Sequence, residues 1–381
     1  MMAATPRHHL AKIFVLLNCI FLCGCERDGK VVVVADFGDR QATGVAVSHD
    51  GRVFVCFPRW SLGHDVSVAE VLDNGTIRPY PNEHLNQWQA DDSPKDRFVC
   101  TQSLYIDTND PAASLWVLDA GNVRFEGVLP GAAKLVRLDL KTNRLARVIR
   151  FDSTIVLPQS YLNDVRVDAQ RGFAYITDSG VGAIVVVDLN TGRSRRVLAE
   201  HAATQAEAGI WPVIDGKPWR LPDGGVPQIH ADGIAISNDK EQLYIKPLTG
   251  RNLYRVAAAK LRNFSIPDSA LDKSPVQLGS VPIGGGMFMS PSGNLYIAAV
   301  ETNAIVRRKP SGQLETILAS NSLSWPNSLA MSQEGDLYIT APQIHLNAAF
   351  SKGPSQRTEP YRLYKVPGVE PKEENPIIPA K

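Results

Sequence analysis

The stretch that decides the fold reads Leu162-Asn163-Asp164-Val165-Arg166-Val167-Asp168 and, after a short turn, Gly172-Phe173-Ala174-Tyr175-Ile176-Thr177-Asp178-Ser179-Gly180. Val165 and Val167 alternate with charged residues, and residues 173–177 are rich in aromatic and β-branched side chains. Both features are typical of β-strands. The stretch therefore predicts two antiparallel strands joined by a turn.

The same strand-turn-strand pattern recurs along the whole chain. Equivalent positions of the first strand fall at residues 45, 104, 165, 234, 287 and 329. A second hairpin follows most copies, for example in residues 135–149 and 183–198. Recurrence at this spacing indicates a repeat architecture. Two hairpins make a four-stranded sheet, and six such sheets around an axis make an all-β, six-bladed β-propeller.

The last copy lacks one strand. After residues 337–340, only residues 361–366 have the composition of a strand. The run Val31-Val32-Val33-Val34 lies upstream of the first copy and has no partner there. We expect this N-terminal strand to join the last blade and close the ring, so that one propeller domain spans residues 31–366. The alternative is a large β-sandwich or two all-β domains.

Composition excludes one class of partner. The 381 residues include 40 Lys and Arg against 39 Asp and Glu, a net charge of +1, and they show no basic block. Nothing therefore indicates nucleic-acid binding. Hydrophobic residues make up 44% of the chain, which is enough for a sizeable core. We expect a monomer.

The N-terminus has the pattern of an export signal. A basic start precedes the apolar run 13–22, which is too short to span a bilayer. The following Leu22-Cys23-Gly24-Cys25 resembles a bacterial lipobox, so residues 1–25 are expected to hold a signal peptide and lipobox, with Cys25 lipidated as the first residue of the mature chain. The protein would then be an envelope lipoprotein of the outer membrane or periplasm, touching the membrane through its lipid anchor only. A plain secretory signal, giving an extracellular protein, is the alternative.

Two further regions carry expectations of their own. Cys56 and Cys100 lie beside strands of neighbouring copies, and an exported compartment permits a disulfide between them. Two buried free thiols are the alternative. The polar, Pro-rich tail 367–381 is expected to be disordered.

Three motifs resemble those of the major royal jelly protein/yellow family. They are Pro58-Arg59-Trp60, Leu162-Asn163-Asp164 leading to Tyr175-Ile176-Thr177-Asp178, and Asp232-Gly233-Ile234-Ala235 followed by Leu243-Tyr244. They stand in the family's order, and the resemblance spans about residues 31–366. It implies a six-bladed propeller. Members are mostly regarded as secreted binding proteins; some bind amines or other small ligands in the channel, and a tautomerase activity is ascribed to some insect members.

Positions just before each inner strand of a propeller face the mouth of the central channel. Here they are polar, and we predict that they bind a small-molecule ligand: Gln102, Asn163, Asp164, His230, Asp232 and Asn327. The aromatic loop 200–229 would supply Trp219 or Trp211 as a wall, and glycines 284–286 would let a ligand approach the backbone. The alternative is that the Asx residues only cap turns.

The sequence is compatible with an enzyme as well as with a binding protein. Gluconolactonase-like propellers resemble the chain in fold and hold a metal in the channel, so Asn163 and Asp232 are candidate ligands for Ca²⁺ or another divalent cation. Thr43 stands where that family places a glutamate, which argues against a hydrolase. A third class is a tethered interaction module with an inert channel. Ligand binding at the channel mouth is the preferred hypothesis, and the metal-dependent hydrolase is its alternative.

Overall fold

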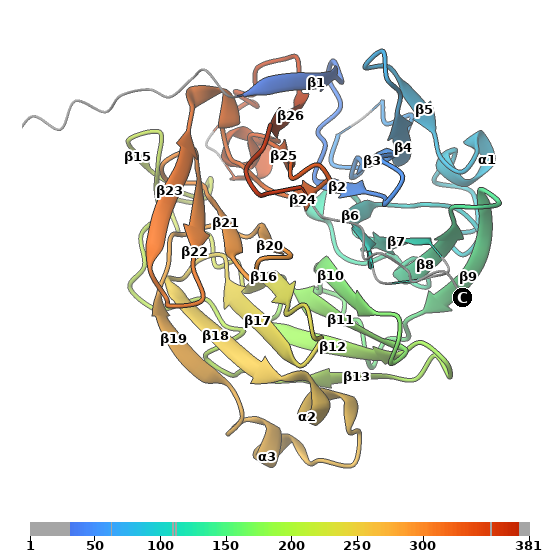
Figure 1. The fold of residues 1–381 in the computed structure, drawn as a ribbon. Helices are drawn as coiled ribbons and strands as arrows, with labels where there is room; N and C mark the ends of the chain where they lie inside the picture. Colours follow the sequence, from blue (N-terminus) through green and yellow to red (C-terminus); the bar gives the residue numbers. More distant parts are fainter. Residues whose placement is uncertain (1–30, 62, 109, 111–112, 351–352, 373–381) are drawn as a thin grey trace, which may run out of the picture.

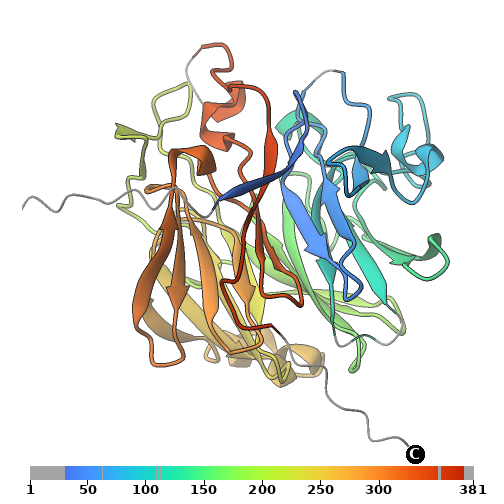
Figure 2. The ribbon, with the colours of Figure 1, turned by 45° about the horizontal axis from the view of Figure 1, so that its top comes forward.

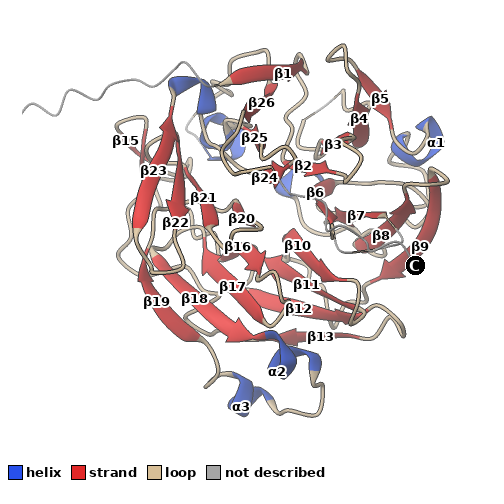
Figure 3. Cartoon of the chain, viewed as in Figure 1, coloured by secondary structure: helices blue, strands red, loops and turns tan. Residues whose placement is uncertain are grey.

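The structure, a computed structural model, describes residues 31–372 apart from 62, 109, 111–112 and 351–352. Its main sheets surround one axis, and each has four antiparallel strands (Figure 1). Strands dominate, and the helices are short and peripheral (Figure 3). The predicted all-β, six-bladed propeller is therefore confirmed. The predicted signal segment and Cys25 lie outside the described residues.

In each of blades one to three, four consecutive strands follow one another outward from the axis. Blade one has β2 (Gly44–Val47), β3 (Val53–Cys56), β4 (Val68–Val71) and β5 (Ile77–Pro79). Blade two has β6 (Thr101–Ile106), β7 (Ser114–Asp119), β8 (Lys134–Asp139) and β9 (Arg144–Arg150). Blade three has β10 (Leu162–Asp168), β11 (Phe173–Asp178), β12 (Ala183–Asp188) and β13 (Ser194–Val197).

Blades four to six follow the same plan. Blade four has β16 (Ala231–Ile236), β17 (Gln242–Pro247), β18 (Asn252–Ala257) and β19 (Val276–Ser280). Blade five has β20 (Met287–Met289), β21 (Leu295–Ala299), β22 (Ala304–Arg308) and β23 (Leu314–Ala319). Blade six has β24 (Leu329–Met331), β25 (Leu337–Thr340), β26 (Arg362–Val366) and β1 (Val32–Asp36).

The remaining elements lie in the connections. Loop 200–229 carries the small hairpin of β14 (Val213–Ile214) and β15 (Lys217–Pro218). The helices are α1 (Glu83–Asn86), α2 (Ala258–Arg262) and α3 (Asp268–Leu271), with 3-10 turns η2 (Val123–Phe125), η3 (Asn321–Leu323), η4 (Ile344–Leu346) and η5 (Ala348–Phe350). None of the helices in the described part of the chain is long and apolar enough to cross a membrane.

The N-terminal strand closes the ring, as predicted. β1 pairs antiparallel with β26, and Val32 lies opposite Lys365 while Asp36 lies opposite Arg362. Figure 1 shows this strand, in blue, beside the red strands of the last blade. The pairing joins the two ends of the repeat array, so the last blade is completed by the first strand of the chain.

Strand alternation packs each blade against both of its neighbours. On β10 and β11, Val165, Val167 and Ile176 belong to a core cluster shared with blade two. Tyr175, on the opposite face of β11, belongs to a cluster shared with blade four. Because successive side chains point to opposite faces of a strand, one apolar strand serves two inter-blade cores.

Cys56 and Cys100 are free thiols, and both are fully buried. Cys56 packs in the cluster between blades one and two, and Cys100 packs in the cluster between blades two and three. Burial raises the pKa of each thiol to about 12. The structure therefore contradicts a disulfide between the two residues and supports the alternative of two buried free thiols, since each sulfur lies in its own apolar cluster.

The structure places residues 367–372, which belong to the predicted disordered tail 367–381. Residues 367–372 pack against the ring, where Val369 N donates to Gly335 O at 2.9 Å. The Glu370 carboxylate is only 7% exposed, and it accepts hydrogen bonds from Ser290, Ser292, Asn294 and Tyr296. The polar composition of the segment predicts disorder, but the Glu370 side chain has four hydrogen-bond donors on blade five, and these hold the segment in place. Residues 373–381 lie outside the described part.

We expect Glu370→Ala to destabilise the propeller by about 1–3 kcal/mol, because it leaves buried donors without an acceptor. Urea unfolding of both proteins would measure the difference. Glu334→Ala is the matched control, since Glu334 pairs at 2.6 Å with Lys372 and both side chains are more than half exposed. An exposed pair contributes at most about 1 kcal/mol. Equal losses in the two variants would contradict an anchoring role for Glu370.

Candidate functional site

A cavity of about 270 Å³ opens at the mouth of the channel where the innermost strands begin. Its walls come from parts of the chain that are distant in sequence, among them Trp60, Gln102, Tyr161, Asn163, Trp219, Asp232, Asn327 and Phe350. Figure 2 shows hairpin β14–β15, in yellow-green, and the red segment that carries η4 and η5 at the same edge of the ring. These two segments partly cover the mouth.

Three of the innermost strands are irregular at the residues that form the floor of this cavity. The register shifts between Thr101 and Ser103 on β6, between Leu162 and Val165 on β10, and between Ala231 and Gly233 on β16. The residues inside these irregular steps include Gln102, Asn163 and Asp232. Bulges redirect side chains and are common next to active sites. Here they aim polar groups at the channel axis.

Hydrogen bonds hold the floor together. Gln102 Nε2 donates to Asn163 Oδ1 at 2.8 Å. Asn327 Nδ2 donates to Thr43 O at 2.8 Å, and Thr43 Oγ1 donates to Gln102 O at 2.9 Å. These bonds cross between neighbouring blades, so the floor is a pre-organised polar surface.

Aromatic rings form the wall above that floor. The Phe125 ring centroid lies 5.0 Å from that of Trp60, 5.5 Å from that of Tyr161 and 5.1 Å from that of Phe350. Trp219 continues the wall, with its centroid 4.9 Å from that of Trp325. Aromatic pairs at these separations attract one another beyond their burial. The rings therefore make a rigid, mostly apolar enclosure.

The Pro58-Arg59-Trp60 motif connects wall and floor. Trp60 Nε1 donates to Tyr161 Oη at 2.7 Å, and Tyr161 Oη donates to Gln102 Oε1 at 2.8 Å. The preceding Arg59 binds the backbone behind the wall, donating to Val99 O at 3.2 Å and to Trp88 O at 3.0 Å. Arg59 therefore has a structural role, whereas Trp60 lines the cavity.

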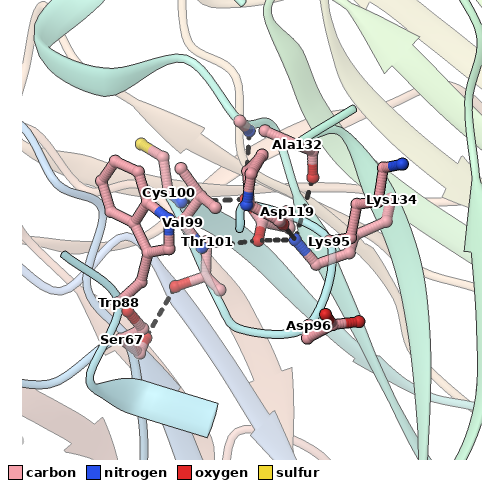
Figure 4. A network of polar contacts seen from close by, with 12 residues as sticks. Ser67, Trp88, Lys95, Asp96, Val99, Cys100, Thr101, Asp119, Ala132 and Lys134 are labelled. Carbon is pink, nitrogen blue, oxygen red and sulfur yellow. Dashed lines mark hydrogen bonds and ion pairs between the residues drawn. The ribbon is translucent and has the colours of Figure 1, made fainter. Parts of the chain in front are cut away.

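Buried aspartates at equivalent positions of two copies hold the segments that lead into the floor. Asp119 ends β7 and accepts from Val99 N at 2.7 Å and Cys100 N at 2.9 Å, while Lys134 Nζ lies 2.9 Å away (Figure 4). Asp178 ends β11, accepts from Tyr161 N at 2.9 Å and pairs with an arginine, Arg196, at 2.7 Å. The last residue of the Tyr175-Ile176-Thr177-Asp178 motif therefore positions Tyr161.

Two aromatic residues at this mouth have a strained backbone conformation. Phe125 has φ = 62° and Trp325 has φ = 61°, the left-handed region that bulky side chains seldom adopt. Such a conformation costs of order 1–3 kcal/mol per residue, and it is often found at functional sites. Both side chains line the cavity. The fold therefore gives up some stability in order to place these two rings.

Asp232 is the carboxylate of the cavity lining, and its charge is perturbed. Burial raises the pKa of Asp232 to about 7, and the nearby negative charge of Asp164 adds to the rise. The positive charge of Lys246 and a hydrogen bond from Asn163 act in the opposite direction. Burial also lowers the pKa of Lys246 to about 8. A perturbed carboxyl group in a cavity marks a candidate functional group.

The glycines at 284–286 serve packing and not ligand access. A Cβ on Gly285 would lie 1.7 Å from Asp232 Oδ1, and one on Gly286 would lie 1.4 Å from Asn327 O. The space that these glycines leave is therefore taken by the neighbouring blades. This corrects the prediction that a ligand would approach the backbone there.

Most of the predicted site residues meet at the cavity. Gln102, Asn163, Asp232, Asn327 and Trp219 all line it. The other three predicted residues, Asp164, His230 and Trp211, do not line it.

Asp164 lies one layer deeper than the cavity. Adjacent strand residues point in different directions, so Asp164 does not follow Asn163 into the cavity. It accepts a hydrogen bond from Ser103 Oγ at 2.5 Å and pairs with Arg166 at 2.8 Å. His230 lies outside the lining, and its Nδ1 accepts from Ala206 N at 3.1 Å. Trp211, two residues before β14, is 54% exposed, and the Arg220 guanidinium group lies 4.3 Å from its ring centroid.

Sequence reasoning missed most of the wall. Phe125, Tyr161, Trp325 and Phe350 were not predicted as site residues, and they come from loops without a shared pattern. Two of them carried a usable signal. Tyr161 directly precedes β10, and Trp325 lies two residues before Asn327. The rule that positions before an inner strand face the mouth would have found both with a wider window.

The donor set fits a divalent cation poorly. Ca²⁺ takes six to eight oxygen ligands, with carboxylates prominent among them. Within the described residues, no group of three His, Cys, Asp or Glu side chains could hold a metal ion. Thr43 Oγ1 is already committed to Gln102 O, and Asp164 is neutralised by Arg166. Of the two predicted metal ligands, Asn163 Oδ1 already accepts a hydrogen bond from Gln102, so Asp232 is the carboxylate left for a metal at this floor.

Fold and cavity together define a six-bladed propeller with a small cavity at one mouth of its channel. The family model described as "Major royal jelly protein" matches residues 99–357. The chain belongs to the major royal jelly protein family. No curated protein matches the chain in sequence.

Solved structures confirm the fold without showing an activity. A luciferin-regenerating enzyme is 12% identical, with a TM-score of 0.56 over 90% of this chain and 96% of that one. A Xanthomonas campestris gluconolactonase is 15% identical (TM-score 0.53, 88% and 89% covered). The calcium-binding protein regucalcin from Agrobacterium tumefaciens is 14% identical (TM-score 0.52, 90% and 94% covered). Identities this low carry only the architecture.

We expect the protein without residues 1–25 to bind no stoichiometric Ca²⁺, because the floor offers too few charged oxygen ligands. Elemental analysis after dialysis, with thermal unfolding in EDTA and in Ca²⁺, would measure this. Asp232→Ala is the control. A stoichiometric ion that is lost in Asp232→Ala would overturn the expectation and support a metal-dependent hydrolase.

Proposed function

We propose that the protein binds a small organic amine at the mouth of its channel, with the ammonium group directed at Asp232. The observation that carries the proposal is the pairing of one carboxylate with an enclosing set of aromatic rings. Asp232 is the acidic residue in the lining, and Trp60, Phe125, Tyr161, Trp219, Trp325 and Phe350 surround the space above it.

Aromatic enclosures favour cations for an electrostatic reason. The face of each ring carries partial negative charge, and a desolvated cation–π contact contributes about 2 kcal/mol. Ammonium and substituted ammonium groups are the usual ligands of such cages. A neutral apolar ligand would contact the aromatic wall but would offer no positive charge to the carboxylate. An anion would be repelled by Asp232 once that residue is ionised.

The size and the amide floor narrow the ligand further. At about 270 Å³, the cavity is at the small end of ligand sites, which typically measure about 300–1,000 Å³. Gln102, Asn163 and Asn327 offer amide groups beside the carboxylate. An amine with one aromatic ring and one further polar group fits these constraints. The family membership also supports an amine ligand, since some members of the family bind amines.

The sequence also favours export and a lipid anchor at Cys25, which we include in the proposal. The support is the apolar run 13–22 followed by the lipobox-like Leu22-Cys23-Gly24-Cys25. A ligand-binding propeller held at a membrane surface would sample small molecules in the envelope or outside the cell.

The metal-dependent hydrolase is retained as the second candidate. It would use Asn163 and Asp232, which do line one cavity. The absence of a glutamate at position 43 and the pairing of Asp164 with Arg166 weigh against it. The calcium analysis described above decides between the two candidates.

Phenethylamine should bind more tightly than 2-phenylethanol, which has the same ring and no positive charge. Asp232→Asn should weaken phenethylamine binding by roughly 30-fold, since removing one partner of a buried charge pair costs about 2 kcal/mol or more. Binding of 2-phenylethanol should change little. Isothermal titration calorimetry would measure both ligands.

Asp223→Asn is the matched control for the removal of one negative charge. Asp223 lies exposed on loop 200–229, outside the cavity lining, so phenethylamine affinity should stay near that of the wild type. Equal affinity of the amine and the alcohol for the wild type would refute the role of Asp232.

Amine affinity should fall as the pH drops below about 7. The raised pKa of Asp232 means that the carboxyl group is protonated below pH 7 and ionised above it. If only the ionised form attracts the ammonium group, affinity falls by roughly tenfold for each pH unit below 7 and levels off above it. Titrations between pH 5.5 and pH 8.5 would show this. The Asp232→Asn variant should give a flat profile.

A further inference from the structure

The opposite mouth of the channel holds a second cavity with different chemistry. Its volume is about 100 Å³, and it is lined where the innermost strands end and turn. Its walls include Ser48, His49, Tyr105, Arg166, Lys240 and Met289. None of the proposed amine-site residues belongs to this lining.

A narrow waist lies between the two cavities. The space between them is only about 20 Å³, and Asp164 and Asp232 are among its lining residues. Arg166 crosses beneath this waist. It leaves β10 of blade three, pairs with Asp164 at 2.8 Å, and donates from Nη2 to Met287 O of blade five at 2.6 Å. The guanidinium group therefore forms the inner wall of the second cavity.

The lining of the second cavity is cationic. Arg166 and Lys240 both contribute to it and are only 7–8% exposed, and among the residues that the structure describes the lining includes no aspartate or glutamate. Their acidic partners lie behind the lining, Asp164 against Arg166 and Asp107 against Lys240 at 2.9 Å. The Tyr105 ring supports the guanidinium group from 5.3 Å. Arg166 and Lys240 thus border a space whose described lining holds no carboxylate, while their ion-pair partners stand on the other side.

The remaining walls are apolar. Leu104, Ile106, Phe288, Met289 and Met331 surround the cationic end. A simple inorganic anion would satisfy the cations but would leave these side chains against water. A short alkyl chain ending in a carboxylate would satisfy both, because a carboxylate matches guanidinium and ammonium donors while the chain covers the apolar wall.

We propose that this second cavity binds a short-chain carboxylate, with the carboxylate group at Arg166 and Lys240. The site is chemically opposite to the amine site, whose lining is acidic and aromatic. The volume limits the ligand to a few heavy atoms. The binding needs no residue of the amine site.

Methionine methyl resonances give a local readout. The chain has five methionines, and in the described residues Met289 and Met331 line this cavity while Met287 lies between the blades. With ¹³C-methyl methionine, butyrate should shift the Met289 and Met331 signals saturably, at about millimolar concentration for so small a ligand. Met289→Leu and Met331→Leu would assign the signals. Butyramide at constant ionic strength is the neutral control.

A matched pair of variants tests the charge requirement. His49 lines the cavity and is exposed, so its replacement should leave the fold intact. His49→Glu should weaken butyrate binding several-fold, and His49→Lys should strengthen it. Neither should alter phenethylamine affinity at the other mouth.

Two results would overturn the proposal. Butyramide shifting the methyl signals as strongly as butyrate would show that the cations do not bind the ligand. The absence of any saturable shift up to about 50 mM butyrate, with the methionine signals intact, would show that Arg166 and Lys240 are structural ties only. Because Asp232 takes no part, failure here leaves the amine proposal standing, and Asp232→Asn should bind butyrate normally.

Discussion

The pairing of β1 with β26 is the constraint on which the rest of the molecule depends. Six twisted sheets around an axis form a closed body only when the last sheet is tied to the first, and here the tie is a strand from the other end of the chain. Because every blade repeats the same four-stranded order, the innermost strands all run in the same direction along the axis. All their starts then meet at one mouth, and all their ends meet at the other.

That geometry explains why chemistry lies in the channel and packing lies between the blades. Side chains along a blade alternate into two inter-blade cores, so few positions remain for polar groups except at the strand ends. The irregular steps at Gln102, Asn163 and Asp232 use that freedom. Burying Asp232 costs stability at neutral pH, as its raised pKa shows. Such a cost at a cavity floor is characteristic of a group retained for binding.

The sequence was sufficient for the fold and for half of the site. Repetition predicts strands, and the unpaired run Val31–Val34 predicts closure, because both follow from local patterns. The floor residues precede inner strands and were found by the same rule. The wall could not be found in this way. Phe125 and Phe350 reach the mouth from irregular loops, and tertiary packing holds Phe125 in a left-handed conformation. The buried place of Glu370 was hidden for a similar reason, since its four partners come from one distant turn and strand.

The two mouths differ because strand starts and strand ends differ in what they can hold. Long loops precede the starts of the innermost strands, so aromatic rings from distant segments can gather there and shield a carboxylate. Ends run directly into tight turns, which leave room only for side chains of the strands and turns themselves, such as Arg166 and Lys240. Asp164 and Arg166 face each other at the waist between the two. The ion pair therefore spans two spaces of opposite character, since Asp164 lines the waist together with Asp232, and Arg166 lines the basic cavity.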